Sequence, residues 1–142
     1  MSICSFYIIH VGPSRFIGHT HDFRGKMYDH YDRAYLTNNS NVSPVQYAMR
    51  NYSTPSTIYG EEIARYSRCS RDELILLEHM YIHRHGADLN SFGRCCFVDY
   101  KYGRYLENRM ILDDVDLEVV NLQELYDDTT FECIMDDDFP IA

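Results

Sequence analysis

The segment SFYIIHVGPSRFIG, residues 5–18, decides the fold. Two runs rich in β-branched and aromatic residues flank the turn Gly12-Pro13-Ser14. Proline fixes φ and glycine tolerates positive φ, so residues 8–11 and 15–17 can pair as an antiparallel hairpin. Alternate residues of a strand share one face of a sheet. We therefore expect Tyr7 to face whatever packs against one side of this hairpin.

A helix is predicted directly after the hairpin, capped by Thr20 or Asp22. Apolar side chains recur at helical spacing along it and predict its packing stripe: Phe23, Met27, Tyr31 and Ala34. Basic side chains are expected off this stripe: Arg24, Lys26, His30 and Arg33. The helix should therefore pack on the sheet and leave a basic flank.

The middle of the chain predicts a short helix and a third strand. Ser43-Pro44 is a cap followed by a first-turn proline, which opens a helix over residues 45–52. A strand is expected to begin at residues 57–59 and to resume at residues 63–66 after Gly60.

The best-defined helix begins at a capping box, with Ser70 as the cap and Glu73 three residues later, and ends at Gly86. One more element is expected among the apolar residues between 115 and 125. The predicted fold is α/β in the broad sense, of the α+β kind, with a small, three-stranded, mainly antiparallel sheet flanked by helices.

Charge is distributed unevenly along the 142 residues. The net charge is −9, yet residues 1–112 hold all 13 Lys and Arg against 11 acids, whereas residues 113–142 hold the other 11 acids and no base. The body is thus mildly basic, and the end supplies the negative excess. We expect a domain over residues 1–92 and a C-terminal extension over residues 93–142 that becomes acidic from residue 113.

Composition excludes several classes of protein. No apolar run approaches the ~20 residues needed to span a bilayer, and the start has no secretory signal, so an intracellular protein of the cytoplasm or nucleus is expected. Five cysteines without a CxxC pair argue against a disulfide framework or a zinc knuckle. Small size without a separate targeting module suggests a stand-alone protein of viral or mobile-element origin.

Five features follow one another in an order known from one nuclease family. They are the triplets Ser5-Phe6-Tyr7 and Phe16-Ile17-Gly18, the helices over residues 22–30 and 76–82, and Asn90. In these features the chain resembles the GIY-YIG nucleases, over roughly residues 3–92. The resemblance implies a Mg²⁺- or Mn²⁺-dependent endonuclease acting on DNA.

The same resemblance assigns roles to individual side chains. It implies a catalytic base at Tyr7, a phosphate-charge partner at Lys26, a proton relay or phosphate contact at His30, and a catalytic, metal-binding glutamate at Glu78. Asn90 would be an orienting group. Together with Arg24 and Arg33, Asn90 is also expected to contact nucleic acid.

Two positions depart from the family pattern. Phe16 stands where the second triplet has tyrosine, and Lys26 stands where the family has arginine. Lys26 is preferred to Arg24 for this position because of its spacing from residues 16–18, and because Lys26 and His30 lie at i, i+4 on one helical face. Lysine lacks the planar fork that grips two phosphate oxygens.

General chemistry also supports phosphodiester hydrolysis by these residues, independently of the family resemblance. Mg²⁺ commonly binds through one or two carboxylates plus substrate phosphate, so Glu78 alone can hold it. A neutral tyrosine is a poor base, because only ~0.1% is phenolate at pH 7, and a nearby cation would lower its pKa.

The same sequence also fits other interpretations. His79 and His83 lie at i, i+4 and can chelate zinc, but a third ligand is not evident. A degenerate nuclease fold could instead serve as a nucleic-acid- or protein-binding module, with the acidic segment contacting a protein partner. The acidic segment could also fold back on the basic residues of the domain, where nucleic acid would bind, as a phosphate mimic.

Overall fold

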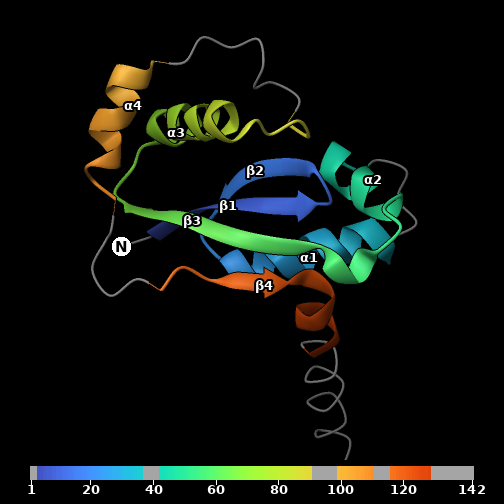
Figure 1. Cartoon of the computed structure of the whole chain (residues 1–142). Helices are drawn as coiled ribbons and strands as arrows, with labels where there is room; N and C mark the ends of the chain where they lie inside the picture. Colours follow the sequence, from blue (N-terminus) through green and yellow to red (C-terminus); the bar gives the residue numbers. More distant parts are fainter. Residues whose placement is uncertain (1–2, 37–41, 91–98, 111–115, 129–142) are drawn as a thin grey trace, which may run out of the picture.

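The computed structural model describes residues 3–36, 42–90, 99–110 and 116–128. Figure 1 shows a sheet with helices on both faces. The elements in chain order are β1 (Ile3–Val11), β2 (Ser14–Thr20), α1 (Phe23–Tyr35), α2 (Pro44–Arg50), the 3₁₀ turn η1 (Pro55–Thr57), β3 (Tyr59–Ser67), α3 (Arg71–His85), α4 (Tyr100–Glu107) and β4 (Val119–Asn121). Residues 122–128 are helical as well.

The sheet has the strand order β2-β1-β3-β4, and every neighbouring pair is antiparallel. The predicted α+β class with an antiparallel sheet is confirmed. The prediction of three strands is wrong, because Val119–Asn121 adds a fourth strand that pairs with β3. Part of the predicted C-terminal extension thus belongs to the same sheet as the hairpin.

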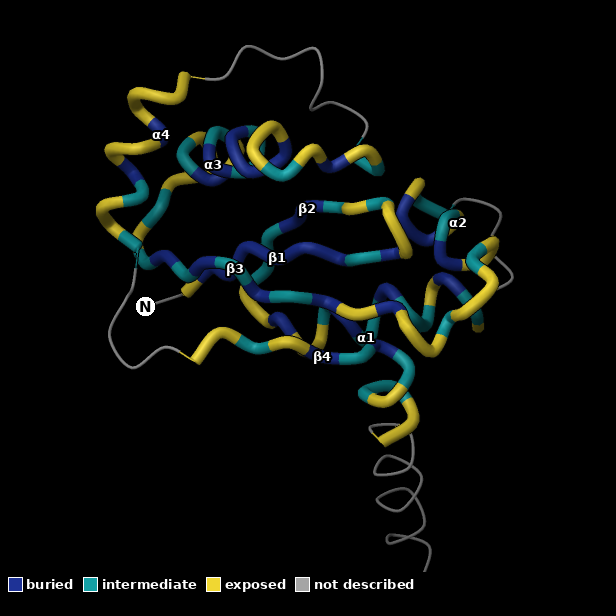
Figure 2. The backbone as a smooth tube through the Cα atoms, in the orientation of Figure 1, coloured by how far each residue is buried: buried dark blue, intermediate teal, exposed yellow. Residues whose placement is uncertain are grey.

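Helices divide over the two faces of the sheet (Figure 1). On one face, α3 packs through Leu77 and Met80 against Phe6 and Ile8. On the other face, α1 and α2 share a second core that includes Tyr7 and Ile9. The central strand β1 is therefore covered on both sides, as the run of buried residues in Figure 2 shows.

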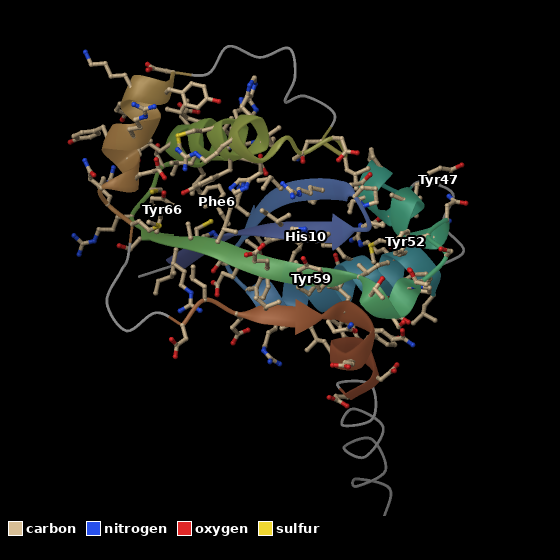
Figure 3. All side chains as sticks on the ribbon, in the orientation of Figure 1. Phe6, His10, Tyr47, Tyr52, Tyr59 and Tyr66 are labelled. Atoms are coloured by element: carbon tan, nitrogen blue, oxygen red, sulfur yellow. The ribbon has the colours of Figure 1, made fainter. Side chains whose placement is uncertain are left out.

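The predicted hairpin is confirmed, with Ile8 opposite Ile17 and Val11 opposite Ser14. Gly12 adopts a φ of +60° in its turn, a conformation that side chains disfavour. Tyr52, labelled in Figure 3, packs over this turn, and a Cβ on Gly12 would lie 2.7 Å from its ring. The chain after α2 therefore holds the tip of the hairpin.

The helix ends follow the predicted capping. Asp22 caps α1 by accepting a hydrogen bond from the Gly25 amide, and Ser70 caps α3 in a capping box with Glu73. Gly86 ends α3 with a φ of +58°. Among the described residues, no helix combines the length and the apolar character required for a membrane span.

Two local predictions are wrong. β3 runs without interruption through Gly60, and its irregularity lies at Ile63, where the pairing steps from Phe6–Ala64 to Tyr7–Glu62. His30 lies within the packing stripe of α1 and is only 4% exposed, instead of lying on the basic flank. Spacing explains this: residues 23, 27, 30 and 34 form one helical face.

Candidate functional site

Tyr7 reaches across the edge strand because its neighbour has no side chain. Tyr7 and Gly18 are opposite each other in the β1–β2 pairing. A Cβ on Gly18 would lie 2.5 Å from the Tyr7 hydroxyl, so the phenol ring occupies the space that a side chain would need. The second triplet thus supplies room for the first, which is a packing reason for glycine at this position.

A pocket of about 550 Å³ opens where this ring ends. Residues of β1, β2 and α1, with others from the chain around the start of α2, line it: Tyr7, Phe16, Lys26, Asp29, His30, Arg33, Val42, Ser43 and Gln46. Three of the four predicted catalytic residues, Tyr7, Lys26 and His30, therefore face one cavity, together with the predicted nucleic-acid contact Arg33.

A chain of buried hydrogen bonds fixes the orientation of His30. The Tyr7 hydroxyl lies 3.0 Å from His30 Nε2, and His30 Nδ1 lies 3.3 Å from Gln46 Nε2. The Ser43 amide donates to Gln46 Oε1 at 3.2 Å. Because a backbone N–H can only donate, Gln46 must present its NH₂ group to His30, so Nδ1 accepts and Nε2 carries the proton. His30 therefore donates to the Tyr7 oxygen.

Burial sets the protonation of both groups. Burial first, and then the negative charges of Glu78 and Asp29, raise the pKa of Tyr7 well above its usual range. Burial, with the positive charge of Lys26 as the next cause, lowers the pKa of His30 to about 4. Near neutral pH the pair therefore consists of a protonated phenol and a neutral imidazole, and a His30 ring in this tautomer cannot take the proton of Tyr7.

We expect this burial to make stability depend on pH. The pKa of His30 is about 4 in the folded state and near 6.5 in the unfolded chain, so its contribution is complete above ~pH 6.5 and is lost as the pH falls. The free energy of unfolding should decrease by about 3 kcal/mol between pH 7 and pH 4 through this group. Urea unfolding of wild type and His30→Gln at each pH measures the difference.

The matched control for this prediction is His83→Gln, an exposed position on α3. Its pH dependence should follow that of wild type. Equal slopes for wild type and His30→Gln would contradict the assignment of a neutral, buried His30.

Charges at the rim of the pocket are partly neutralised. Asp29 lies 3.9 Å from Lys26 Nζ and 3.2 Å from Arg33 Nε, measured from its two carboxylate oxygens. All three side chains are substantially exposed, so these ion pairs are weak and can exchange for a phosphate. The rim keeps one net positive charge.

Glu78 does not line this pocket. It projects from α3, on the opposite face of the sheet, and its Oε1 lies 3.4 Å from Nδ1 of His19 on β2. Its partner His19 directly follows Gly18, over which the Tyr7 ring lies, and the charge of Glu78 contributes to the raised pKa of Tyr7.

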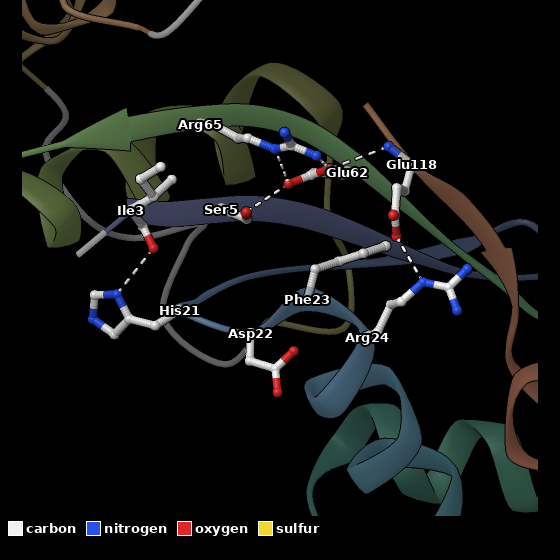
Figure 4. A pocket seen from close by; sticks show the side chains of 9 residues that line it. All are labelled: Ile3, Ser5, His21, Asp22, Phe23, Arg24, Glu62, Arg65 and Glu118. Atoms are coloured by element: carbon white, nitrogen blue, oxygen red, sulfur yellow. Dashed lines mark hydrogen bonds and ion pairs between the residues drawn. The ribbon is translucent and has the colours of Figure 1, made fainter. Parts of the chain in front are cut away.

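The other two predicted nucleic-acid contacts lie outside the pocket. The Asn90 side chain donates to the Ile17 carbonyl and accepts from the Ile17 amide, both at 2.8 Å, so it orients β2 beside Phe16 and Gly18. Arg24 donates to Glu118 at 3.1 Å, in a separate pocket shown in Figure 4. This places Arg24 on the flank of α1 that faces the C-terminal segment.

The described part of that segment does not cover the candidate site. Tyr126 stacks on Tyr28 and Tyr31, with ring centroids 4.7 and 4.8 Å away, on a side of α1 that is turned by about 100–160° from Lys26 and His30. At the Tyr7 pocket the phosphate-mimic hypothesis therefore finds no support from residues 116–128, although Glu118 pairs with one predicted nucleic-acid contact, Arg24. The other residues of the acidic segment, 113–115 and 129–142, lie outside the described residues.

Sequence reasoning missed Gln46, Ser43 and Asp29. Gln46 and Ser43 approach His30 only through the packing of α2 on α1, which no local pattern indicates. Asp29 was visible as an i, i+3 partner of Lys26. The hydroxyl oxygen of Ser43 is buried without a hydrogen-bond partner among the described residues, beside the pocket.

Comparisons with protein-family models, with curated proteins and with solved structures found no match. Among the described residues, no three His, Cys, Asp or Glu side chains form a cluster that could hold a metal ion. The alternative of a zinc site at His79 and His83 therefore gains no third ligand from these residues.

Proposed function

We propose that this protein is a metal-dependent endonuclease that hydrolyses DNA phosphodiester bonds with a site of the GIY-YIG kind. One observation carries the proposal: Tyr7, Lys26 and His30, assigned from the resemblance, face one pocket at the β2 edge. A tyrosine hydroxyl, a basic rim and a nearby carboxylate are the groups that phosphodiester hydrolysis requires. DNA is the proposed partner, and the cell interior, cytoplasm or nucleus, is the proposed location.

Lys26 and Arg33 would bind the phosphate at the pocket rim, since both lie on α1 and pair there with the exposed carboxylate of Asp29, in weak ion pairs. His30 would hold the Tyr7 oxygen by donating its Nε2 proton. The hydroxyl proton of Tyr7 is then free to point into the pocket, toward a substrate oxygen or a water molecule. Asn90 would keep β2 in position, as its two hydrogen bonds to Ile17 indicate.

Glu78 would hold Mg²⁺ or Mn²⁺. Its carboxylate fits the role because it is partly exposed and lies near Tyr7. A bound divalent ion supplies charge neutralisation at the phosphate and lowers the pKa of a bound water or hydroxyl group. Burial raises the pKa of Tyr7, so the phenol stays protonated unless a cation lies nearby. Tyr7 can therefore act as a base only if such a cation lowers its pKa.

A second function is favoured by a specific observation. Phe16 occupies the wall of the pocket beside Tyr7 and His30, with ring centroids at 6.3 and 5.7 Å, and it offers no hydroxyl. Together with Lys26 and the raised pKa of Tyr7, it would suit a degenerate nuclease fold that binds nucleic acid without cleaving it. A protein partner for the acidic C-terminal segment belongs to this second proposal.

An assay of plasmid nicking, with purified protein and supercoiled plasmid, distinguishes the endonuclease from the binding module. We expect nicking with Mg²⁺ or Mn²⁺ that EDTA abolishes and that Glu78→Ala removes. Glu61→Ala is the matched control, because Glu61 is an exposed carboxylate that pairs with His10 on β1. Cleavage that survives Glu78→Ala would come from a contaminant, and binding of DNA without cleavage in either metal would favour the binding module.

A further inference from the structure

His19 and Glu78 form an isolated pair of metal-ligand side chains outside the Tyr7 pocket. His19 lies on β2 and points to the α3 face, where its ring packs 5.5 Å from Phe6. Glu78 meets it from α3, and the two side chains are 31% and 24% exposed. The histidine nitrogen nearest to the carboxylate, Nδ1, is itself buried and has no hydrogen-bond partner among the described residues.

The distance between them does not suit a good hydrogen bond. Nδ1 and Oε1 are 3.4 Å apart, whereas a charge-assisted N–H···O bond is about 2.7–2.9 Å long. Two ligands about 2.1 Å from a shared metal ion, at an angle of 90–110°, lie about 3.0–3.4 Å apart. The observed separation therefore matches neighbouring ligands of one ion.

Both side chains belong to regular elements that hold them in place. β2 pairs with β1 along its length, and Asn90 fixes its outer edge at Ile17. α3 has a capping box at its start and packs Leu77, the neighbour of Glu78, in the core. Ligands on such elements keep their separation without a bound ion, which lowers the cost of binding one.

We propose that His19 is a second protein ligand beside Glu78, and that the pair binds a divalent transition-metal ion, with Mn²⁺ preferred over Mg²⁺. Imidazole nitrogen suits transition metals, whereas Mg²⁺ favours an all-oxygen shell. Two protein ligands leave most coordination positions for water or a phosphate oxygen. This inference rests on the proposed function for its biological purpose, because that function assigns Glu78 to a metal.

Metal binding by the full chain tests the proposal without reference to cleavage. Titration with Mn²⁺ alone, followed by the loss of the free-ion electron paramagnetic resonance signal, gives its affinity, and competition with Mg²⁺ gives the preference. Wild type should bind one Mn²⁺ more tightly than Mg²⁺. His19→Ala and His19→Gln should weaken Mn²⁺ binding at least about 10-fold, since losing even a side chain that only orients a ligand costs about 10- to 100-fold.

Mg²⁺ binding should change far less in the His19 variants, so the preference for Mn²⁺ should disappear. Glu78→Ala should lose both ions, and His83→Ala, an exposed histidine on the same helix, should behave as wild type. Circular dichroism spectra and melting temperatures of the two His19 variants establish that they are folded. Unchanged Mn²⁺ affinity in both folded His19 variants, or no Mn²⁺ binding by wild type, would overturn the proposal.

The two proposals fail in distinguishable ways. A protein that binds Mn²⁺ through His19 and Glu78 but leaves plasmid intact would refute the nuclease and keep this metal site. A protein that nicks plasmid in a Glu78-dependent manner, with Mn²⁺ affinity unaffected by His19→Ala, would refute this metal site and keep the nuclease.

Discussion

Replacing Tyr7 with phenylalanine is expected to lower plasmid nicking by about 10²–10⁴-fold, the usual contribution of a positioned general base. The hydroxyl is the only part of Tyr7 that can exchange a proton in the pocket, and the substitution removes that group while leaving the ring over Gly18. It also leaves the buried Nε2–H of His30 without its acceptor. A stability loss of about 1–3 kcal/mol should accompany the loss of activity.

Tyr66→Phe is the matched control for this substitution. Tyr66 is also fully buried, and its hydroxyl lies 2.7 Å from the hydroxyl of Tyr81 on the other face of the sheet. It should lose similar stability and keep its nicking rate. Rates are compared at a temperature at which both variants are folded, and equal rates for Tyr7→Phe and wild type would contradict the assigned role.

Glu62→Ala is expected to lower the free energy of unfolding by about 4 kcal/mol, within the range for breaking a buried ion pair. The Glu62 side chain is 2% exposed and lies at the centre of a network shown in Figure 4. It accepts hydrogen bonds from Ser5 Oγ at 2.5 Å, from Arg65 at 2.6 and 2.7 Å, and from the Glu118 amide at 3.1 Å. The substitution would leave these donors unpaired beside the β3–β4 pairing.

The adjacent residue provides the control. Glu61 has a side chain that is 41% exposed and pairs with His10 at 2.9 Å, so Glu61→Ala should cost less than about 1 kcal/mol. Urea unfolding of both variants measures the difference. Similar losses would show that the Glu62 network contributes no more than a surface ion pair.

The Glu62 network also determines how acid affects the fold. Burial opposes ionisation of Glu62, but the hydrogen bonds from Arg65, Ser5 and Glu118 outweigh it and hold its pKa below the usual range. A carboxyl group with a lowered pKa stabilises the folded state above its unfolded pKa, and this contribution is lost as the pH falls through the folded value. Protonation of Glu62 and of His30 thus both lower the free energy of unfolding in acid.

Local signals predicted most of the fold. The turn at Gly12, the caps at Asp22 and Ser70 and the stop at Gly86 are decided by neighbouring residues, so the sequence indicates them directly. One more element was expected between residues 115 and 125, and β4 lies there, but its type and its pairing with β3 could not be predicted in the same way. It has three residues, and it forms because β3 offers an unpaired edge and Val120 fills the core beside it.

The candidate site was predictable only in part. Motif spacing and a shared helical face placed Lys26 and His30 near Tyr7, and one pocket includes all three. Their protonation could not be read from the chain, because it depends on burial and on Gln46, which approaches from α2. The location of Glu78 beside His19 depends on how α3 crosses the sheet, which no local pattern specifies.

The segment after α3, residues 88–90, forms hydrogen bonds to the outer edge of β2, where a neighbouring strand would otherwise pair. The Leu89 amide donates to the Arg15 carbonyl, the Arg15 amide donates to Asp88, and Asn90 uses both ends of its amide on Ile17. These contacts occupy backbone groups that would otherwise recruit a strand from another molecule. The polypeptide thereby protects one border of its sheet against edge-to-edge aggregation, and it does so with three consecutive residues instead of a fifth strand.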